Sequence, residues 1–279
     1  MAVKFVIDSA SDVLPAEAQA MGVTHLPLKV IFGQEEFADG VTLSHEAFFE
    51  KLENAQQLPT TCQVPPADFE AAFENLVGQG HQVVAITLSS GLSGTYQSAM
   101  IAASDFEDQV FVVDSLTAAV GERVLLMRGL ELAEEGLGAK EIAEILQQER
   151  HKIRLVAVLD TLEYLKKGGR ISAATALAGG LLAIKPAIEV KDGKVSMAGT
   201  ARGLKKANAL LKELIQGYGI NFEKPMALTC AGSDRLLQGF IQDSQDLWEG
   251  RQALPVYSLG CTIGTHVGPG AYGIAFFEK

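Results

Sequence analysis

The sequence predicts an α/β protein with two domains. Strand-like apolar runs alternate with helix-like runs along almost the whole chain, which is typical of sheets flanked by helices. The 279 residues are too many for one compact core of ordinary size, so two domains are expected, residues 1–151 and 152–279. Regular alternation in the first half favours a mostly parallel sheet there. The second half is expected to form another α/β domain.

The first half contains the elements of the predicted parallel sheet. A small hairpin insertion turning at Gly33 is expected over 26–40. Apolar spacing and glycine stops predict helices after each strand. The predicted strands are 4–9, 82–90 and 109–115, and the main predicted helices are 43–55, 66–80, 94–104 and 116–150, the last interrupted at Gly136 and Gly138.

The second half opens with a predicted strand at 153–160. Two short strands, 184–190 and 194–199, are expected to turn at Asp192-Gly193. The remaining predictions are helices at 201–219 and 235–248 and strands at 225–233, 253–260 and 272–278. The run 171–188 is apolar and rich in small residues. We interpret it first as a core helix, with the wall of a ligand tunnel as the alternative.

Composition excludes some classes of function. The net charge of -11 argues against general nucleic-acid binding, which needs a basic surface. The three cysteines form no C-x-x-C pair, so no metal site is expected and a reducing compartment is favoured. The N-terminal apolar run is short and soon followed by Asp8 and Asp12, unlike a signal peptide. A cytoplasmic protein without stable membrane insertion and without a cofactor is expected.

The stretch LSSGLSGTYQSA, residues 88–99, lies where a strand becomes a helix. A phosphate loop would need a lysine, which is missing. Gly91 to Thr95 resembles the G-x-S-x-G turn of serine hydrolases, with His266 and Asp114 available as triad partners. The alternative prediction is therefore a serine acyl hydrolase that uses Ser93 and His266.

A third interpretation of this stretch is an anion cradle at a helix start. Free N–H groups, glycines and the hydroxyls of Ser93 and Thr95 would bind an anion without a formal positive charge. Ordinary helix capping by the same hydroxyls is the competing explanation. Two more segments favour a shared site. Residues 58–66 offer Thr60 and Thr61, and residues 263–276 place Thr265 and His266 in a predicted glycine-rich bend between two strands.

These segments together resemble the signatures of the DegV family, in the family's order and over essentially the whole chain. No single segment is decisive, but the set is specific. The segments are IDSASDVLP, PTTCQVPP, LSSGLSGTYQSA, VVDS, LEYLKKGGRIS, the IKP segment and IGTHVGPGAYGIAF.

The resemblance implies a lipid carrier rather than an enzyme. Members of the family bind a long-chain fatty acid between two α/β domains, and several are the fatty-acid-binding subunit of bacterial fatty acid kinase. A separate ATP-dependent kinase subunit phosphorylates the bound carboxylate, and the acyl phosphate enters phospholipid synthesis. Carried over to this chain, the resemblance implies that Thr61 and Ser93 hold the carboxylate, with the Gly94 N–H and His266 beside them. Where the family often has T-S-Q-P, this chain has Thr61-Cys62-Gln63-Val64.

Basic residues stand out in this acidic chain. Arg170 follows two glycines and two lysines, Lys166 and Lys167, and Arg202 lies further along the second half. We hypothesise that Arg170 and Arg202 flank the tunnel mouth, where they contact an acyl phosphate or the kinase. A solvated charge cluster is the alternative explanation. Asp8 and Ser9, at the end of the first predicted strand, are interpreted as strand-ending residues.

Overall fold

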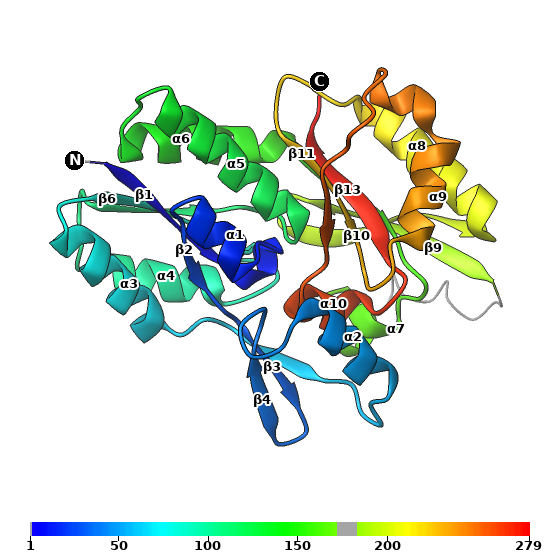
Figure 1. The fold of residues 1–279 in the computed structure, drawn as a ribbon, viewed down its shortest axis with the longest axis horizontal. Helices are drawn as coiled ribbons and strands as arrows, with labels where there is room; N and C mark the ends of the chain where they lie inside the picture. The colour runs from blue at the N-terminus through cyan, green and yellow to red at the C-terminus, as the bar shows by residue number, and fades with distance from the viewer. Residues whose placement is uncertain (1, 172–182) are drawn as a thin grey trace.

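A parallel four-stranded sheet forms the first half of the chain. The computed structural model describes residues 2–171 and 183–279 (Figure 1). The strand order is β2-β1-β6-β7 and every neighbouring pair is parallel, as predicted. The strands are β1 (Val3–Asp8), β2 (Thr24–Leu26), β6 (Gln82–Thr87) and β7 (Val110–Asp114), and the helices are α1 (Pro15–Ala20), α3 (Pro66–Gly78), α4 (Thr95–Ala103), α5 (Val120–Glu134) and α6 (Ala139–Glu149).

The predicted hairpin is the centre of a small antiparallel sheet. Its strands β3 (Lys29–Phe32) and β4 (Glu35–Ala38) pair around a turn that contains Gly33, which confirms the insertion. A third strand, β5 (Thr60–Cys62), pairs with β3 and was not predicted. Helix α2 (His45–Glu53) lies between the hairpin and β5 in the sequence. The pairing matters for the site because it fixes Thr61 opposite Val30.

The second half is built on a six-stranded sheet that is mostly antiparallel. Its order is β10-β9-β8-β13-β11-β12, and only the β11–β12 pair is parallel. The hairpin predicted to turn at Asp192-Gly193 is confirmed as β9–β10. The elements are β8 (Ile153–Val158), α7 (Glu163–Lys167), β9 (Ile184–Lys191), β10 (Lys194–Arg202), α8 (Leu204–Tyr218), β11 (Met226–Cys230), α9 (Arg235–Asp243), β12 (Val256–Ser258), α10 (Cys261–Val267) and β13 (Tyr272–Phe277).

Helix α5 lies between the two large sheets (Figure 1). It packs against β1 and β6 of the first sheet and against β8, β11 and β13 of the second. Its residues from Val120 to Leu126 are all buried, as expected for a helix covered on every side. One apolar core therefore continues from the first half into the second. The boundary at residue 151 stays a prediction; α6 ends at Glu149 and β8 starts at Ile153.

The structure corrects two sequence predictions. Thr265 and His266 do not lie in a bend between strands, because they belong to helix α10. The helix predicted over 235–248 ends at Asp243 and is followed by a separate 3-10 turn, Gln245–Trp248. Of the small-residue run 171–188, residues 172–182 lie outside the described residues, so the two interpretations stay untested there, while Ile184–Ile188 belong to strand β9 and not to a helix. Across 2–171 and 183–279, the helices all fall short of the length and apolarity that crossing a membrane requires.

Candidate ligand-binding site

An apolar cavity of about 350 Å³ lies where the two halves meet. The first half contributes loop and helix-start residues such as Leu88, Leu92 and Ala119. The second half contributes side chains from the face of its sheet, among them Leu155 and Ile188. Ligand pockets usually have volumes of about 300–1,000 Å³ and few polar groups, so this cavity is of ordinary size for a small ligand.

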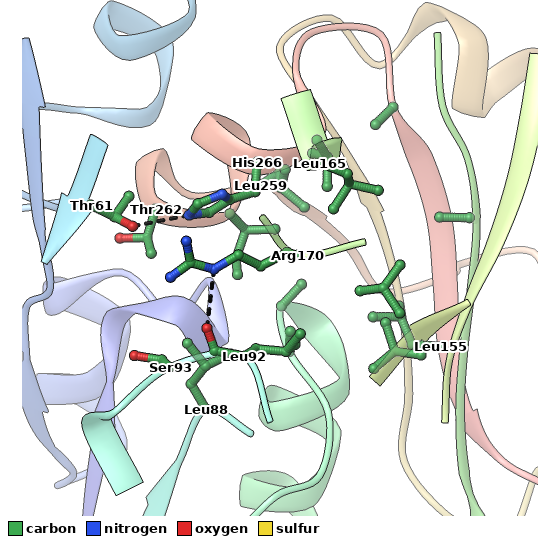
Figure 2. Close-up of a pocket in the computed structure, with 18 of the residues that line it drawn as sticks. Thr61, Leu88, Leu92, Ser93, Leu155, Leu165, Arg170, Leu259, Thr262 and His266 are labelled. Atoms are coloured by element: carbon green, nitrogen blue, oxygen red, sulfur yellow. Dashed lines mark hydrogen bonds between the residues drawn. The ribbon is translucent and has the colours of Figure 1, made fainter. Parts of the chain in front are cut away.

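Polar side chains gather at one end of the cavity, as Figure 2 shows. All four residues singled out for binding, Thr61, Ser93, Gly94 and His266, line it. Thr61 Oγ1 and His266 Nε2 are 2.9 Å apart and hydrogen-bonded. The Ser93 hydroxyl lies 3.0 Å from the hydroxyl of Thr95. The structure therefore brings together residues that are 205 positions apart in the sequence.

Two buried carboxylates hold the loop that carries Ser93. The Leu88 N–H donates to Asp8 at 2.8 Å, and the Ser90 N–H donates to Asp114 at 3.1 Å. Asp8 and Asp114 end the parallel strands β1 and β7, which flank the strand that leads into this loop. Burial, with a smaller effect of Asp39, raises the pKa of Asp8 to about 7. Asp8 is therefore more than a strand-ending residue.

A third carboxylate, Asp39, holds helix α10 and with it His266. The N–H groups of Cys261 and Thr262 each donate to Asp39 at 2.9 Å, and the Ser9 hydroxyl donates to it at 3.2 Å. Asp39 comes from the hairpin end in the first half, while α10 belongs to the second. The acid thus satisfies free N–H groups at the helix start and fixes the helix across the junction of the two halves.

His266 is held in its neutral form. Burial, helped by the positive charge of Arg170, lowers its pKa to about 4. A Cβ atom on Gly168 would collide with the His266 ring at Nδ1, so glycine at 168 permits the close approach of α7. Since a neutral imidazole has one N–H, a hydrogen on Nε2 would donate to Thr61 and leave the Thr61 hydroxyl hydrogen for a ligand.

Of the two arginines proposed at the tunnel mouth, only Arg170 lines the cavity in the described part of the chain. Its guanidinium donates to the backbone carbonyls of Leu92, at 3.2 Å, and Gly168. In Figure 2 it lies between the Thr61–His266 pair and Ser93. Arg202 is the last residue of β10, where it pairs with Ile184 at the start of β9, and it is not among the residues around the cavity.

Sequence reasoning missed Thr262. It is 2% exposed and lines the cavity, and its hydroxyl has no hydrogen-bond partner among the described residues. Figure 2 shows it beside Thr61 and His266. The signal was its spacing: Thr262 precedes His266 by four residues, which puts both on one face of a helix. The expected bend between strands hid that relation.

The hydrolase triad predicted as an alternative is not formed. His266 Nε2 pairs with Thr61, and within the described residues no hydrogen bond joins His266 to Ser93. Asp114 accepts the N–H groups of Ser90 and Leu116 rather than orienting the histidine. A serine nucleophile needs a base within hydrogen-bond reach and a third group to orient that base. Over the described ranges, no cluster of three histidine, cysteine or acidic residues is arranged to hold a metal ion.

Fold and site together define a class of protein. It is an α/β protein in which helix α5 joins two sheets, an apolar cavity lies where the two halves meet, and mostly uncharged donors gather at one end of that cavity. The family model described as an uncharacterised protein of the DegV family matches residues 2–279, so the chain belongs to the DegV family.

Relatives of known structure share the whole fold. A DegV family protein from Thermus thermophilus described as binding fatty acid is 31% identical, covers 100% of both chains and has a TM-score of 0.89. One from Eubacterium eligens, loaded with heptadecanoic acid, is 26% identical, covers 100% of both chains and has a TM-score of 0.87. A DegV domain-containing protein from Deinococcus radiodurans is 34% identical over 99% of this chain and 98% of its own.

Removing the Asp39 carboxylate should destabilise the protein. In Asp39→Ala, two buried N–H groups at the start of α10 lose charge-assisted hydrogen bonds, which contribute about 1.5–3 kcal/mol each. The free energy of unfolding, measured by urea denaturation, is expected to fall by about 3 kcal/mol. Glu46→Ala, at an exposed position of α2, is the control and should stay close to the parent protein. A loss below about 1 kcal/mol for Asp39→Ala would contradict this role.

Proposed function

We propose that the chain binds one long-chain fatty acid in the cavity and presents its carboxylate to a separate ATP-dependent kinase. The proposal depends on one observation: Thr61, Ser93 and His266 lie together at one end of an apolar cavity. Fatty acids are bound by the Thermus thermophilus and Eubacterium eligens relatives, which share the fold. The protein is then a carrier, with catalysis in the kinase.

The cavity wall supplies the binding free energy for the acyl chain. Each methylene removed from water contributes about 0.8 kcal/mol. A chain with about 14 methylenes thus gains on the order of 11 kcal/mol before the costs of ordering are subtracted. Leucine, isoleucine, valine and alanine side chains supply most of this wall.

Neutral donors satisfy the carboxylate. In the proposed complex the hydroxyls of Thr61 and Ser93 donate to its oxygens, the Gly94 N–H at the start of α4 adds a donor, and His266 orients Thr61. Hydrogen bonds to a charged group are the strong ones, whereas an unpaired buried carboxylate is very costly. Thr262 extends this set with a further hydroxyl.

The two ends of the cavity differ in access to solvent, which supports presentation to a partner. Thr61 and Ser93 are partly exposed, and Cys62 and Gly94 beside them are exposed. At the other wall Leu155, Ile188 and Val190 of the sheet are buried. A kinase could therefore reach the carboxylate while the acyl chain stays covered. Arg170, and more remotely Arg202, are proposed contacts for the acyl phosphate or the kinase, in the cytoplasm and ahead of phospholipid synthesis.

The first test is extraction of the purified protein with organic solvent, followed by mass spectrometry. One free fatty acid per chain is expected. The double variant Thr61→Val, Ser93→Ala loses two hydrogen bonds to a charged group, so its affinity for a fluorescent fatty acid should fall by at least about a hundredfold. Ser104→Ala, an exposed position after α4, is the control. A parent protein that neither contains nor binds a fatty acid would refute the proposal.

The kinase step has its own measurement. The loaded protein, ATP and a fatty acid kinase catalytic subunit are expected to give acyl phosphate, trapped as the hydroxamate. Omitting either protein should abolish the product. Product formed by this chain and ATP alone would contradict a carrier role.

A further inference from the structure

A row of small residues crosses the cavity face of the second sheet. Cross-strand pairing aligns Ile188 of β9 with Ala157 of β8, Ala157 with Gly273 of β13, and Gly273 with Thr229 of β11. Residues paired directly across strands point to the same face of a sheet. Ile188, Ala157 and Thr229 all line the cavity, so this row lies along its floor.

Gly273 has no side chain, so the sheet surface is recessed at this position of the row. A Cβ atom at this position would be 2.5 Å from the carbonyl oxygen of Val156 and 2.7 Å from the Cβ of Ala157. Any larger residue would therefore disturb the sheet and would also fill the space beside Thr229. The cavity wall beside Gly273 is therefore formed by small apolar residues, and the hydroxyl of Thr229 lies next to them.

That hydroxyl has no partner in the described part of the chain. Thr229 is 4% exposed, and its Oγ1 atom accepts and donates no hydrogen bond there. Its neighbours along the chain on this face, Ala227 and Ala231, offer no polar side-chain atom, and its cross-strand neighbour Tyr257 of β12 makes no hydrogen bond to it. Thr262, the other cavity hydroxyl without a partner, belongs to α10 beside His266 and is explained by the carboxylate.

An unpaired buried hydroxyl costs about 1–3 kcal/mol, and valine would fill nearly the same space without that cost. A plain methylene chain cannot form a hydrogen bond with the Thr229 hydroxyl. A hydroxyl group on the acyl chain can, and this bond satisfies both the Thr229 hydroxyl and the hydroxyl of the ligand. We propose that the cavity recognises a fatty acid that carries a hydroxyl group on its acyl chain, and that Thr229 determines this specificity. The inference rests on the proposed function and names its ligand class.

The experiment compares stearic acid with monohydroxystearic acids that carry the hydroxyl at carbon 2, 3, 8, 10 or 12. Binding of each to the delipidated protein is measured by displacement of a fluorescent fatty acid. One isomer places its hydroxyl against Thr229. The parent protein is expected to bind that isomer at least about tenfold more tightly than the other isomers, whose hydroxyls are buried without a partner.

Two variants separate recognition from packing. Thr229→Val keeps the shape and removes the hydroxyl, so the preferred isomer should fall to the affinity of the others while stearic acid binds as well as before or better. Thr87→Val makes the same change at a buried hydroxyl that also lacks a partner among the described residues but does not line the cavity. It should keep the parent preference.

Three results would overturn the inference. The first is that the parent protein binds all isomers alike, and the second is that Thr229→Val keeps the preference for one isomer. The third is that Thr229→Val weakens the binding of stearic acid and of every isomer equally, which would make Thr229 a carboxylate ligand. In each of these cases stearic acid still binds, so the proposed function survives. Absence of binding for stearic acid and all isomers would instead refute the proposed function itself.

Discussion

Replacing Ala157 with phenylalanine is expected to abolish fatty-acid binding while the protein stays folded. Ala157 lines the cavity from the middle of the second sheet, between Ile188 and Gly273 in the cross-strand row. An aromatic ring there would fill space that the acyl chain needs. Excluding about six methylenes removes about 5 kcal/mol of binding free energy, a factor of a few thousand in affinity.

The measurement is titration of a fluorescent fatty acid, with thermal unfolding recorded in parallel. The ring enters an existing cavity, so the midpoint of unfolding should not drop by more than a few degrees. Ala71→Phe, at an exposed position of α3, is the matched control and should bind normally. If Ala157→Phe binds within threefold of the parent protein, the acyl chain does not occupy this cavity.

Replacing Glu122 with glutamine is expected to stabilise the protein increasingly as the pH rises. Glu122 lies on α5 and is fully buried, and both carboxylate oxygens lack a hydrogen-bond partner among the described residues. Burial, and then the nearby carboxylates of Asp8, Asp12 and Asp114, raise its pKa well above the usual 4.5. The folded protein therefore keeps Glu122 protonated at a pH where the unfolded chain has lost that proton.

The sign of the effect follows from proton binding. Above pH 4.5 the folded state binds more protons at this site than the unfolded state, so stability falls with rising pH by up to about 1.4 kcal/mol per unit. Glutamine resembles the protonated acid and does not titrate. The free energy of unfolding of Glu122→Gln should therefore be close to that of the parent near pH 4.5 and exceed it by a margin that grows toward pH 8.

Urea denaturation of both proteins from pH 4.5 to 8 gives the difference directly. The difference in unfolding free energy between the parent and Glu122→Gln reports on Glu122 and leaves out the contribution of Asp8. The raised pKa of Asp8 changes stability with pH in the same direction. Glu141→Gln, at an exposed position of α6, should show no pH-dependent gain. A difference that stays constant with pH would mean that Glu122 is ionised in the folded protein.

The sequence predicted most of the strands, though not β2 or β5, together with the hairpin insertion and the grouping of Thr61, Ser93, Gly94 and His266. Glycine- and proline-rich segments with hydroxyl or imidazole groups are recognisable before folding, because loops at strand ends carry binding residues. The antiparallel strand order of the second sheet was harder to predict from the sequence. It depends on long-range pairing such as β8 with β13, whose residues Val158 and Tyr272 are far apart in the sequence.

Helix α10 shows why the rest of the site could not be predicted. Cys261–Val267 contains two β-branched threonines, an isoleucine and a glycine, which are weak helix formers. Its first N–H groups are satisfied by Asp39, a residue more than 200 positions earlier. Local patterns carry no information about such a partner, so Thr262 and the carboxylates behind the site emerged only with the fold.

The position of α5 limits how relatives could exchange parts. By sequence the helix belongs to residues 1–151, yet it also packs against β8, β11 and β13 of the other half. A chimera joined near residue 151 would combine an α5 surface from one parent with a sheet surface from another. Such hybrids should fold well only where the two surfaces are matched in volume, and recombination within α5 would be tolerated less than exchange of the small β3–β4 hairpin.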